Sequence, residues 1–205
     1  MRTSRLALLA VPGILMLGLT ACNSGSGGGD GEGDGEITGG GPTECVTGLW
    51  DADVADLATQ MGEHLTANGL PITSSTGSGS QQLSLDEQGY AGFASTGLQF
   101  VITADLDNDL VLTVTQTHNG SMRSDWGWDS DTVFGFANIT DEGYDVKTVA
   151  DINGTSTDYP VDIPLGGMSD VPLSVTCDGD TMTTKAEQSP FTTTWHRAGE
   201  AVVFE

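Results

Sequence analysis

The chain has 205 residues, of which 29 are acidic and only six are basic, so its formal net charge at neutral pH is −23. This charge argues against a nucleic-acid-binding protein, whose contacts with phosphates are cationic, and against docking of a folded domain on anionic lipid. Solubility and self-repulsion explain the acidity most simply. Recognition of a cationic partner and adaptation to salt are the alternatives.

The first 21 residues have the layout of a signal peptide. Arg2 and Arg5 are the only basic residues of this stretch, and residues 6–19 are almost continuously apolar. A membrane-spanning helix needs about 20 apolar residues, whereas this run is shorter and ends in small residues before a cysteine, as a cleavage site does. We therefore expect residues 1–21 to be removed.

Residues 19–22, Leu-Thr-Ala-Cys, resemble the bacterial lipobox. In proteins with this motif the cysteine carries a thioether-linked diacylglycerol, the chain is cleaved before it, and the new amino terminus is acylated. For Cys22 the resemblance implies a lipid anchor in the cell membrane or envelope, with the rest of the chain outside the cytoplasm, because two acyl chains hold a protein stably on a bilayer. An ordinary signal peptide with an unrelated cysteine is the alternative.

The other two cysteines are Cys45 and Cys177. If Cys22 is lipidated, they are the one remaining pair in an oxidising compartment, and only one connectivity is possible. We therefore expect a disulfide between them. Two buried free thiols are the alternative.

Composition divides the mature chain into a tether and a domain. Residues 22–43 are mostly Gly, Ser, Asp and Glu, which offer almost nothing to bury, so a flexible tether is expected. Without the signal peptide, four basic residues oppose 29 acidic ones, and the net charge becomes −25. Residues 44–205 have a length that suits a single domain, which we expect to be monomeric.

One helix is predicted, over residues 52–68. Asp51 or Asp53 can cap its start, and Gly69 followed by Pro71 can end it. Its apolar side chains recur at helical spacing and share one face, which consists of Val54, Leu57, Ala58, Met61 and Leu65.

The rest of the domain has the pattern of antiparallel β-structure. Short segments rich in Thr, Val, Leu and aromatic residues alternate with turn signals, and residues 98–104 place every second side chain on an apolar face. Glycine turns are predicted at Asn119-Gly120, Asn153-Gly154 and Asp178-Gly179, and more weakly at Gln88-Gly89 and Glu142-Gly143. We expect nine or ten strands in a mainly β fold. Because hairpin-linked strands must hide their edges, we predict closure into an antiparallel up-and-down barrel, with a β-sandwich as the alternative.

Short motifs at both ends of this domain resemble those of lipocalins. Residues 47–50, Thr-Gly-Leu-Trp, followed by a helix, are similar to the first-strand Gly-x-Trp motif, and residues 194–197, Thr-Trp-His-Arg, are similar to the last-strand motif. In lipocalins an arginine packs over the tryptophan and closes the barrel floor, which implies the same pairing for Trp50 and Arg197. The chain departs from the family in placing its helix after the first strand and in lacking an evident Thr-Asp motif.

No motif predicts catalysis, a metal site or a cofactor. The three histidines share no metal-ligand spacing. Asp105, Asp107 and Asp109 begin like a calcium loop but lack its glycine and its glutamate, so a solvated turn is expected, with weak calcium binding left open. The serines form no nucleophile elbow, and no free cysteine is left to act with a histidine. We therefore expect a protein without enzymatic activity.

Trp126 and Trp128 are the most distinctive side chains of the domain. Strand alternation sends both to one face, with Gly127 between them. We interpret them, together with Phe100 and Phe136, as candidate lining of an apolar ligand cavity. Filling of the core is the alternative, with equal weight.

Our leading hypothesis is a membrane-anchored extracytoplasmic lipoprotein that binds a small apolar or amphipathic ligand inside a lipocalin-like barrel. The alternative is a non-catalytic interaction protein of the cell envelope, with a packed barrel that contacts protein or glycan. An envelope enzyme is a third, weaker hypothesis. Fold alone does not decide among them.

Overall fold

The computed structural model describes residues 41–106, 109–158 and 168–204. The expected signal peptide, Cys22 and the tether up to residue 40 lie outside these residues, as does Asp107. The chain separates into two units, Met1–Gly33 and Asp34–Glu205. All the elements described below belong to the second unit.

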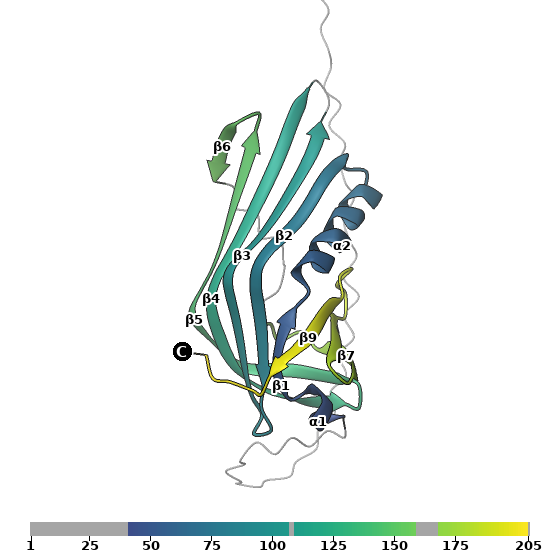
Figure 1. Cartoon of the computed structure of the whole chain (residues 1–205), viewed down its shortest axis with the longest axis vertical. Coiled ribbons are helices and arrows are strands. Elements are labelled where there is room, and N and C mark those ends of the chain that lie inside the picture. The colour runs from purple at the N-terminus through teal and green to yellow at the C-terminus, as the bar shows by residue number, and fades with distance from the viewer. Residues whose placement is uncertain (1–40, 107–108, 159–167, 205) are drawn as a thin grey trace, which may run out of the picture. The chain divides into compact units, whose positions relative to one another are not determined.

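Two helices and nine strands make up the described part of this unit (Figure 1). The helices are α1 (Thr43–Val46) and α2 (Val54–Ala67). The strands are β1 (Gly48–Ala52), β2 (Ile72–Leu85), β3 (Tyr90–Leu106), β4 (Leu110–Ser130), β5 (Val133–Ile152), β6 (Thr155–Asp158), β7 (Leu173–Asp178), β8 (Thr181–Ala186) and β9 (Thr193–Gly199). The prediction of a mainly β fold with one substantial helix is confirmed.

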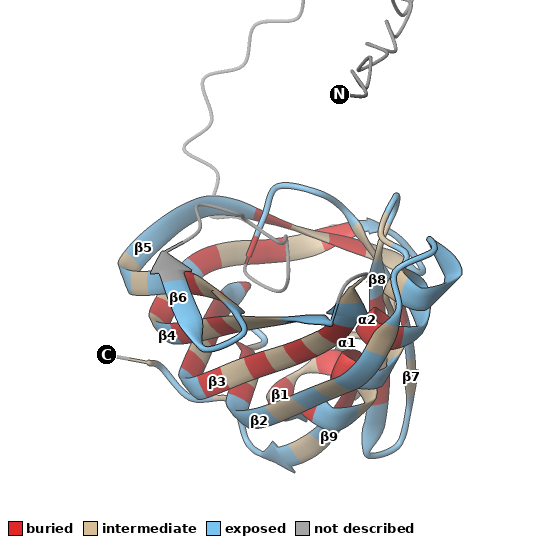
Figure 2. Cartoon of the chain, turned by 90° about the horizontal axis from the view of Figure 1, so that it is seen from above, coloured by how far each residue is buried: buried red, intermediate tan, exposed pale blue. Residues whose placement is uncertain are grey.

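All nine strands belong to one antiparallel sheet that closes in a ring. Its order is β4-β3-β2-β1-β9-β8-β7-β5-β6, and β4 also pairs with β5. Figure 2 views the sheet from above, with the buried residues of its strands in red. Between the described parts of β5 and β7, two residue pairs close the ring, Val133–Ser174 and Phe134–Leu173. A single closed sheet takes the place of the two stacked sheets that a sandwich would need.

The amphipathic face predicted for the helix is buried in α2. Asp53 caps the helix by accepting a hydrogen bond from the Asp56 amide at 2.9 Å, and Gly69 has the positive φ of a helix-ending glycine. Four residues of the predicted face, all but the half-buried Leu65, are buried against alternate residues of β3. This helix cluster consists of Val54, Leu57, Ala58, Met61, Leu98, Phe100 and Ile102.

A second, larger cluster fills the interior of the ring. Its side chains come from β1, β2, β3, β4, β5, β7, β8 and β9, with Val46 of α1 and Met168 added. The aromatic members of this ring cluster are Trp50, Phe93, Trp126, Trp128, Phe134, Phe136 and Trp195. The ring cluster and the helix cluster share no buried residue, and the half-buried Ala52 packs against both.

The first strand and the last strand pair at Trp50 and Arg197. The guanidinium carbon of Arg197 lies 4.2 Å from the centre of the Trp50 ring, and the same guanidinium donates hydrogen bonds to the carbonyl oxygens of Cys45 and Thr47 at 2.6 and 2.7 Å. The expected disulfide between Cys45 and Cys177 is present and ties α1 to β7, with 6.1 Å between the Cα atoms. Together these contacts close the ring at its α1 end.

The turns predicted at Asn119-Gly120 and Glu142-Gly143 are wrong, because both pairs lie inside long strands, β4 and β5. The other three glycine turns fall between strands, as predicted. Each of the four long strands β2 to β5 contains one glycine with positive φ: Gly79, Gly97, Gly120 and Gly143. Where these glycines lie, the pairing of β2 with β3 and of β4 with β5 shifts in register, as at a β-bulge.

Gly120→Ala is expected to destabilise the domain by about 2–4 kcal/mol. The φ of Gly120 is +99°, and an added Cβ would lie 2.1 Å from the carbonyl oxygen of Gly143, so both backbone strain and steric overlap oppose a side chain. Gly127 lies on the same strand with no neighbour within 4 Å of such a Cβ. Gly127→Ala is therefore the matched control and should leave the urea midpoint within a few tenths of a molar. Equal midpoints for the two variants would contradict this account of the bulge.

Candidate functional site

A cavity of about 670 Å³ lies in the ring, where residues of both cores meet. Leu57 of α2 contributes from the helix cluster, and Leu83, Phe93 and Trp195 contribute from the ring cluster. Small-molecule sites usually have volumes of about 300–1,000 Å³ and mostly apolar walls. The cavity therefore has the size and lining of a ligand site.

The apolar wall comes from widely separated parts of the chain. It includes four aromatic side chains, Phe93 of β3, Phe136 of β5, Phe191 of the segment before β9, and Trp195 of β9. Trp195 is well fixed, because its indole nitrogen donates to the Thr184 hydroxyl at 2.9 Å. One side of the wall is thus aromatic, with the Trp195 ring held by a hydrogen bond.

A buried row of polar side chains crosses the same interior. His118, which lines the cavity and is 1% exposed, lies with Nε2 3.0 Å from the Gln116 carbonyl oxygen and with Nδ1 2.8 Å from the Tyr144 hydroxyl. Because an amide oxygen only accepts, Nε2 donates to Gln116 and Nδ1 accepts from Tyr144. Gln116 in turn donates to the Thr148 hydroxyl at 3.3 Å. In this row both ring nitrogens of His118 are hydrogen-bonded to uncharged groups.

Burial raises the pKa of the Tyr144 hydroxyl above its ordinary value of 10.0. The nearby Ser95 hydroxyl partly offsets this rise, although the two groups do not reach hydrogen-bonding geometry. In the unfolded chain the Tyr144 hydroxyl ionises at its ordinary pKa, whereas in the folded chain it keeps its proton to higher pH. The folded state therefore has its full stability below about pH 10 and loses stability as the pH rises further.

Tyr144→Phe should therefore flatten the loss of stability above about pH 10. Phenylalanine keeps the ring but has no proton to lose, so the free energy of unfolding should fall less steeply above about pH 10. The loss of the hydrogen bond to His118 should lower the free energy of unfolding at every pH. Urea unfolding at a series of pH values, for the parent and the variant, measures both effects. Parallel curves above about pH 10 would show that Tyr144 does not contribute to the alkaline loss.

The four predicted ligand-lining residues occupy different places. Trp126, Trp128 and Phe136 meet in the ring cluster, whereas Phe100 belongs to the helix cluster. Of the four, only Phe136 lines the cavity. The indole nitrogens of the two tryptophans donate to the Asp86 carbonyl and to the Thr43 hydroxyl, both at 3.0 Å. In this structure Trp126 and Trp128 thus pack beside the cavity, as part of the core.

Sequence reasoning missed the polar residues of the wall, above all Gln81, His118 and Thr184. All three are buried on strands, on the side of the sheet that faces the interior. The sequence does contain a signal for such wall residues. It is a polar side chain that shares the inward face of a strand with apolar ones, as Gln81 does with Leu83 and Leu85. Trp195 is also absent from the predicted lining, because the sequence presents it only as part of the lipocalin-like motif that contains Arg197.

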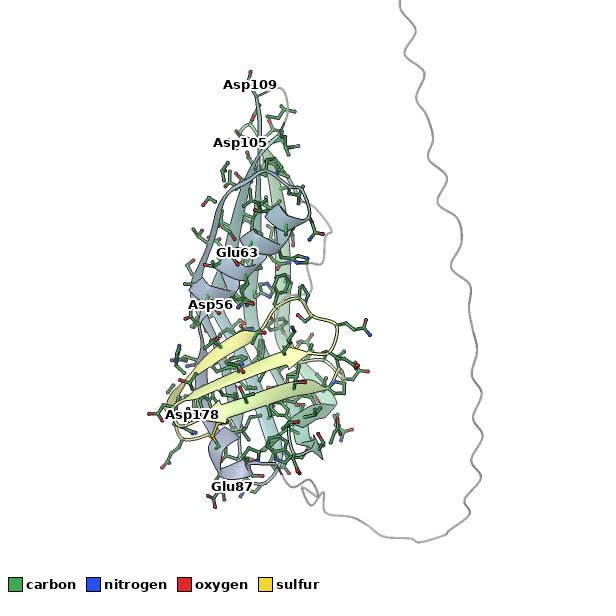
Figure 3. The ribbon with its side chains drawn as sticks, turned by 90° about the vertical axis from the view of Figure 1, so that its right-hand side faces the viewer. Asp56, Glu63, Glu87, Asp105, Asp109 and Asp178 are labelled. Atoms are coloured by element: carbon green, nitrogen blue, oxygen red, sulfur yellow. A yellow bond between two sulfur atoms is a disulfide. The ribbon has the colours of Figure 1, made fainter. Side chains whose placement is uncertain are left out.

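Acidic side chains lie on the outside of the domain and not in the cavity wall. Figure 3 labels six of them, on α2, at the end of β3, at the β3–β4 turn, on β7 and in the β2–β3 turn. Among the residues described here, no group of three or more His, Cys, Asp or Glu side chains has the arrangement of a metal site. None of the described helices has the length and apolar character needed to cross a membrane.

A smaller cavity of about 290 Å³ lies against residues 201–204, which follow the last strand. It is bounded by Tyr90 and Arg123 and by Gly92, where an added Cβ would lie 2.6 Å from the Phe204 ring. This cavity is separate from the polar row of the ring interior.

Comparisons of the chain with models of protein families, with curated proteins and with solved structures give no match.

Proposed function

We infer that this chain is a lipid-anchored extracytoplasmic protein whose folded unit binds a small apolar or amphipathic ligand inside a lipocalin-like up-and-down barrel. The observation that carries the proposal is the cavity of about 670 Å³, with its largely apolar wall, inside the closed ring. A non-catalytic role is proposed with it. We expect the folded unit to act as a monomer.

Two further observations support the barrel interpretation. Neighbouring strands of the ring run antiparallel, and the successive long strands β2, β3, β4 and β5 are joined as hairpins. Arg197 lies over Trp50 where the first and last strands pair, which is the arrangement that the lipocalin resemblance implies for these two residues. A guanidinium over an indole face is worth about 0.5–2 kcal/mol.

Native mass spectrometry of the unit 34–205, produced in an oxidising compartment, tests ligand binding. This unit contains every described strand, both cores and the disulfide, so it is the part expected to fold. A retained amphiphile would support the proposal and identify the ligand class. A bare protein mass, together with retention on cell-wall material, would instead favour the packed interaction protein.

Trp195 provides an optical test of the same proposal, because it is the tryptophan that lines the cavity. Filling the cavity with an apolar probe should shift tryptophan emission, and Trp195→Phe should remove most of that shift while leaving binding intact. Trp128→Phe is the matched control, because Trp128 packs in the core beside the cavity. A shift that persists in Trp195→Phe and vanishes in Trp128→Phe would place the probe elsewhere.

The lipid anchor is tested on the full chain. Cys22→Ser should abolish incorporation of labelled acyl chains and prevent cleavage before residue 22. Labelling that persists in the variant would rule out the anchor while leaving the ligand proposal standing.

A further inference from the structure

The cavity contains no charged side chain among the described residues that line it. Its polar members are amides, hydroxyls and His118, whose ring nitrogens are both engaged with uncharged groups. Burying an ionised group without a partner of opposite charge costs several kcal/mol. The wall is therefore suited to an uncharged ligand.

All four basic residues that follow the signal peptide can be placed, and none lines this cavity. Lys147 and Lys185 are exposed on β5 and β8, and Arg123 pairs with Glu142 on the outside of the sheet. Arg197 lies over Trp50 and donates to main-chain oxygens at the closed end of the ring. An anionic head group bound in the cavity would find no cation, and the net charge of the chain would repel it.

Gln81 has hydrogen-bonding capacity that no other described residue uses. Its side chain lines the cavity and is 2% exposed, and it makes no hydrogen bond to another residue of the described ranges. Ser95, its direct partner in the β2–β3 pairing, has a buried hydroxyl that likewise lacks a hydrogen-bond partner among the described residues. Buried polar groups are nearly always paired, so a polar ligand group accounts for the Gln81 side chain, which lines the cavity, whereas Ser95 does not line it.

We propose that the cavity selects an uncharged amphiphile, such as a long-chain alcohol, ester or monoacylglycerol, with its polar group hydrogen-bonded to Gln81, and that it discriminates against fatty-acid carboxylates. This inference rests on the proposed function, because it specifies the ligand of the same cavity. The Gln81 amide both donates and accepts, so it can pair with a hydroxyl or with an ester carbonyl.

The test compares ligands that share one alkyl chain and differ in the head group. Binding of 1-dodecanol, methyl dodecanoate, dodecanoate, dodecylammonium and the bare alkane dodecane to the unit 34–205 is measured at neutral pH by the change in tryptophan emission. The alcohol and the ester are expected to bind at least about tenfold more tightly than either charged ligand, because burying a charge without a partner of opposite charge costs more than the roughly 1.4 kcal/mol that a tenfold change in Kd represents.

Gln81→Met tests the contact itself. This variant should bind the alcohol about three- to tenfold more weakly and dodecane as before. Gln82→Met is the matched control, because the next side chain on β2 points to the outer face and donates to Asp51 at 2.8 Å. It should leave binding of every ligand unchanged, and thermal unfolding of both variants shows that each is folded.

The possible results separate the two proposals. If dodecanoate or dodecylammonium binds as tightly as the alcohol, the head-group selection is overturned while the binding function stands. If Gln81→Met lowers binding of dodecane and alcohol equally, Gln81 has a structural role and the proposed contact is overturned. If none of the five ligands binds, the proposed function fails as well.

Discussion

Replacing both Cys45 and Cys177 by alanine is expected to lower the free energy of unfolding by about 5 kcal/mol at 25 °C. The bridge spans 132 residues of sequence, and closing so long a loop removes much of the conformational entropy of the unfolded chain. In the native state the bridge also fixes α1, a helix of four residues that is too short to be stable by itself. Urea unfolding of the double variant and the parent measures the difference.

The reductant supplies the control for this prediction. Adding dithiothreitol to the parent should bring its urea midpoint close to that of the double variant and should leave the variant unchanged. A single substitution is less informative, because the remaining thiol can form a bridge between two molecules. A loss below about 1 kcal/mol would show that the unfolded chain is already compact around the two cysteines.

The helix was predictable from sequence because its signal is local. Its apolar stripe, its Asp53 cap and its Gly69 end all lie within one segment, and the same residues that form the stripe pack against β3 in the structure. No partner from elsewhere in the chain is needed to interpret this pattern. The alternation over residues 98–104 is predictable for the same reason, with Leu98, Phe100 and Ile102 all buried.

The strand boundaries were less predictable because a glycine with positive φ occurs both in hairpin turns and inside bulged strands. An Asn-Gly pair can form a hairpin turn, as Asn153-Gly154 does between β5 and β6, or lie inside a strand beside a bulge, as Asn119-Gly120 does in β4 next to register shifts on β3 and β5. Long-range pairing decides which one forms. The Asn119 side chain accepts a hydrogen bond from the Gly97 amide at 2.8 Å, a contact with the neighbouring strand that periodicity along one strand does not reveal.

The same limit applies to the candidate site. Alternation places Trp126 and Trp128 correctly on one inward face, and both are buried. Whether an inward residue fills the core or borders a cavity depends on what covers it from other elements. Here α1 covers Trp128 through Thr43, while Phe136 reaches the cavity from the adjacent strand. Gln81 likewise becomes a cavity residue only when the ring closes, because the other walls of the cavity come from strands far away in the sequence.

Trp50→Ala should destabilise the domain by about 3–5 kcal/mol, an effect comparable with that of removing the disulfide. The Trp50 side chain is fully buried in the ring cluster, and its indole nitrogen donates to the Val46 carbonyl at 2.7 Å. Alanine leaves a void in the core, leaves that carbonyl without its donor and removes the ring on which the Arg197 guanidinium rests.

Trp50→Phe separates these contributions. It retains an aromatic ring beneath Arg197 but loses the indole N–H and part of the volume, so a smaller loss of about 1–3 kcal/mol is expected. A double-mutant cycle with Arg197→Met isolates the contact between the two side chains, which should contribute about 0.5–2 kcal/mol of coupling energy. A coupling energy near zero would mean that Arg197 holds the closed end of the ring through the Cys45 and Thr47 carbonyls alone. The first and last strands would then be joined there by main-chain hydrogen bonds, and the tryptophan would contribute only by filling the core.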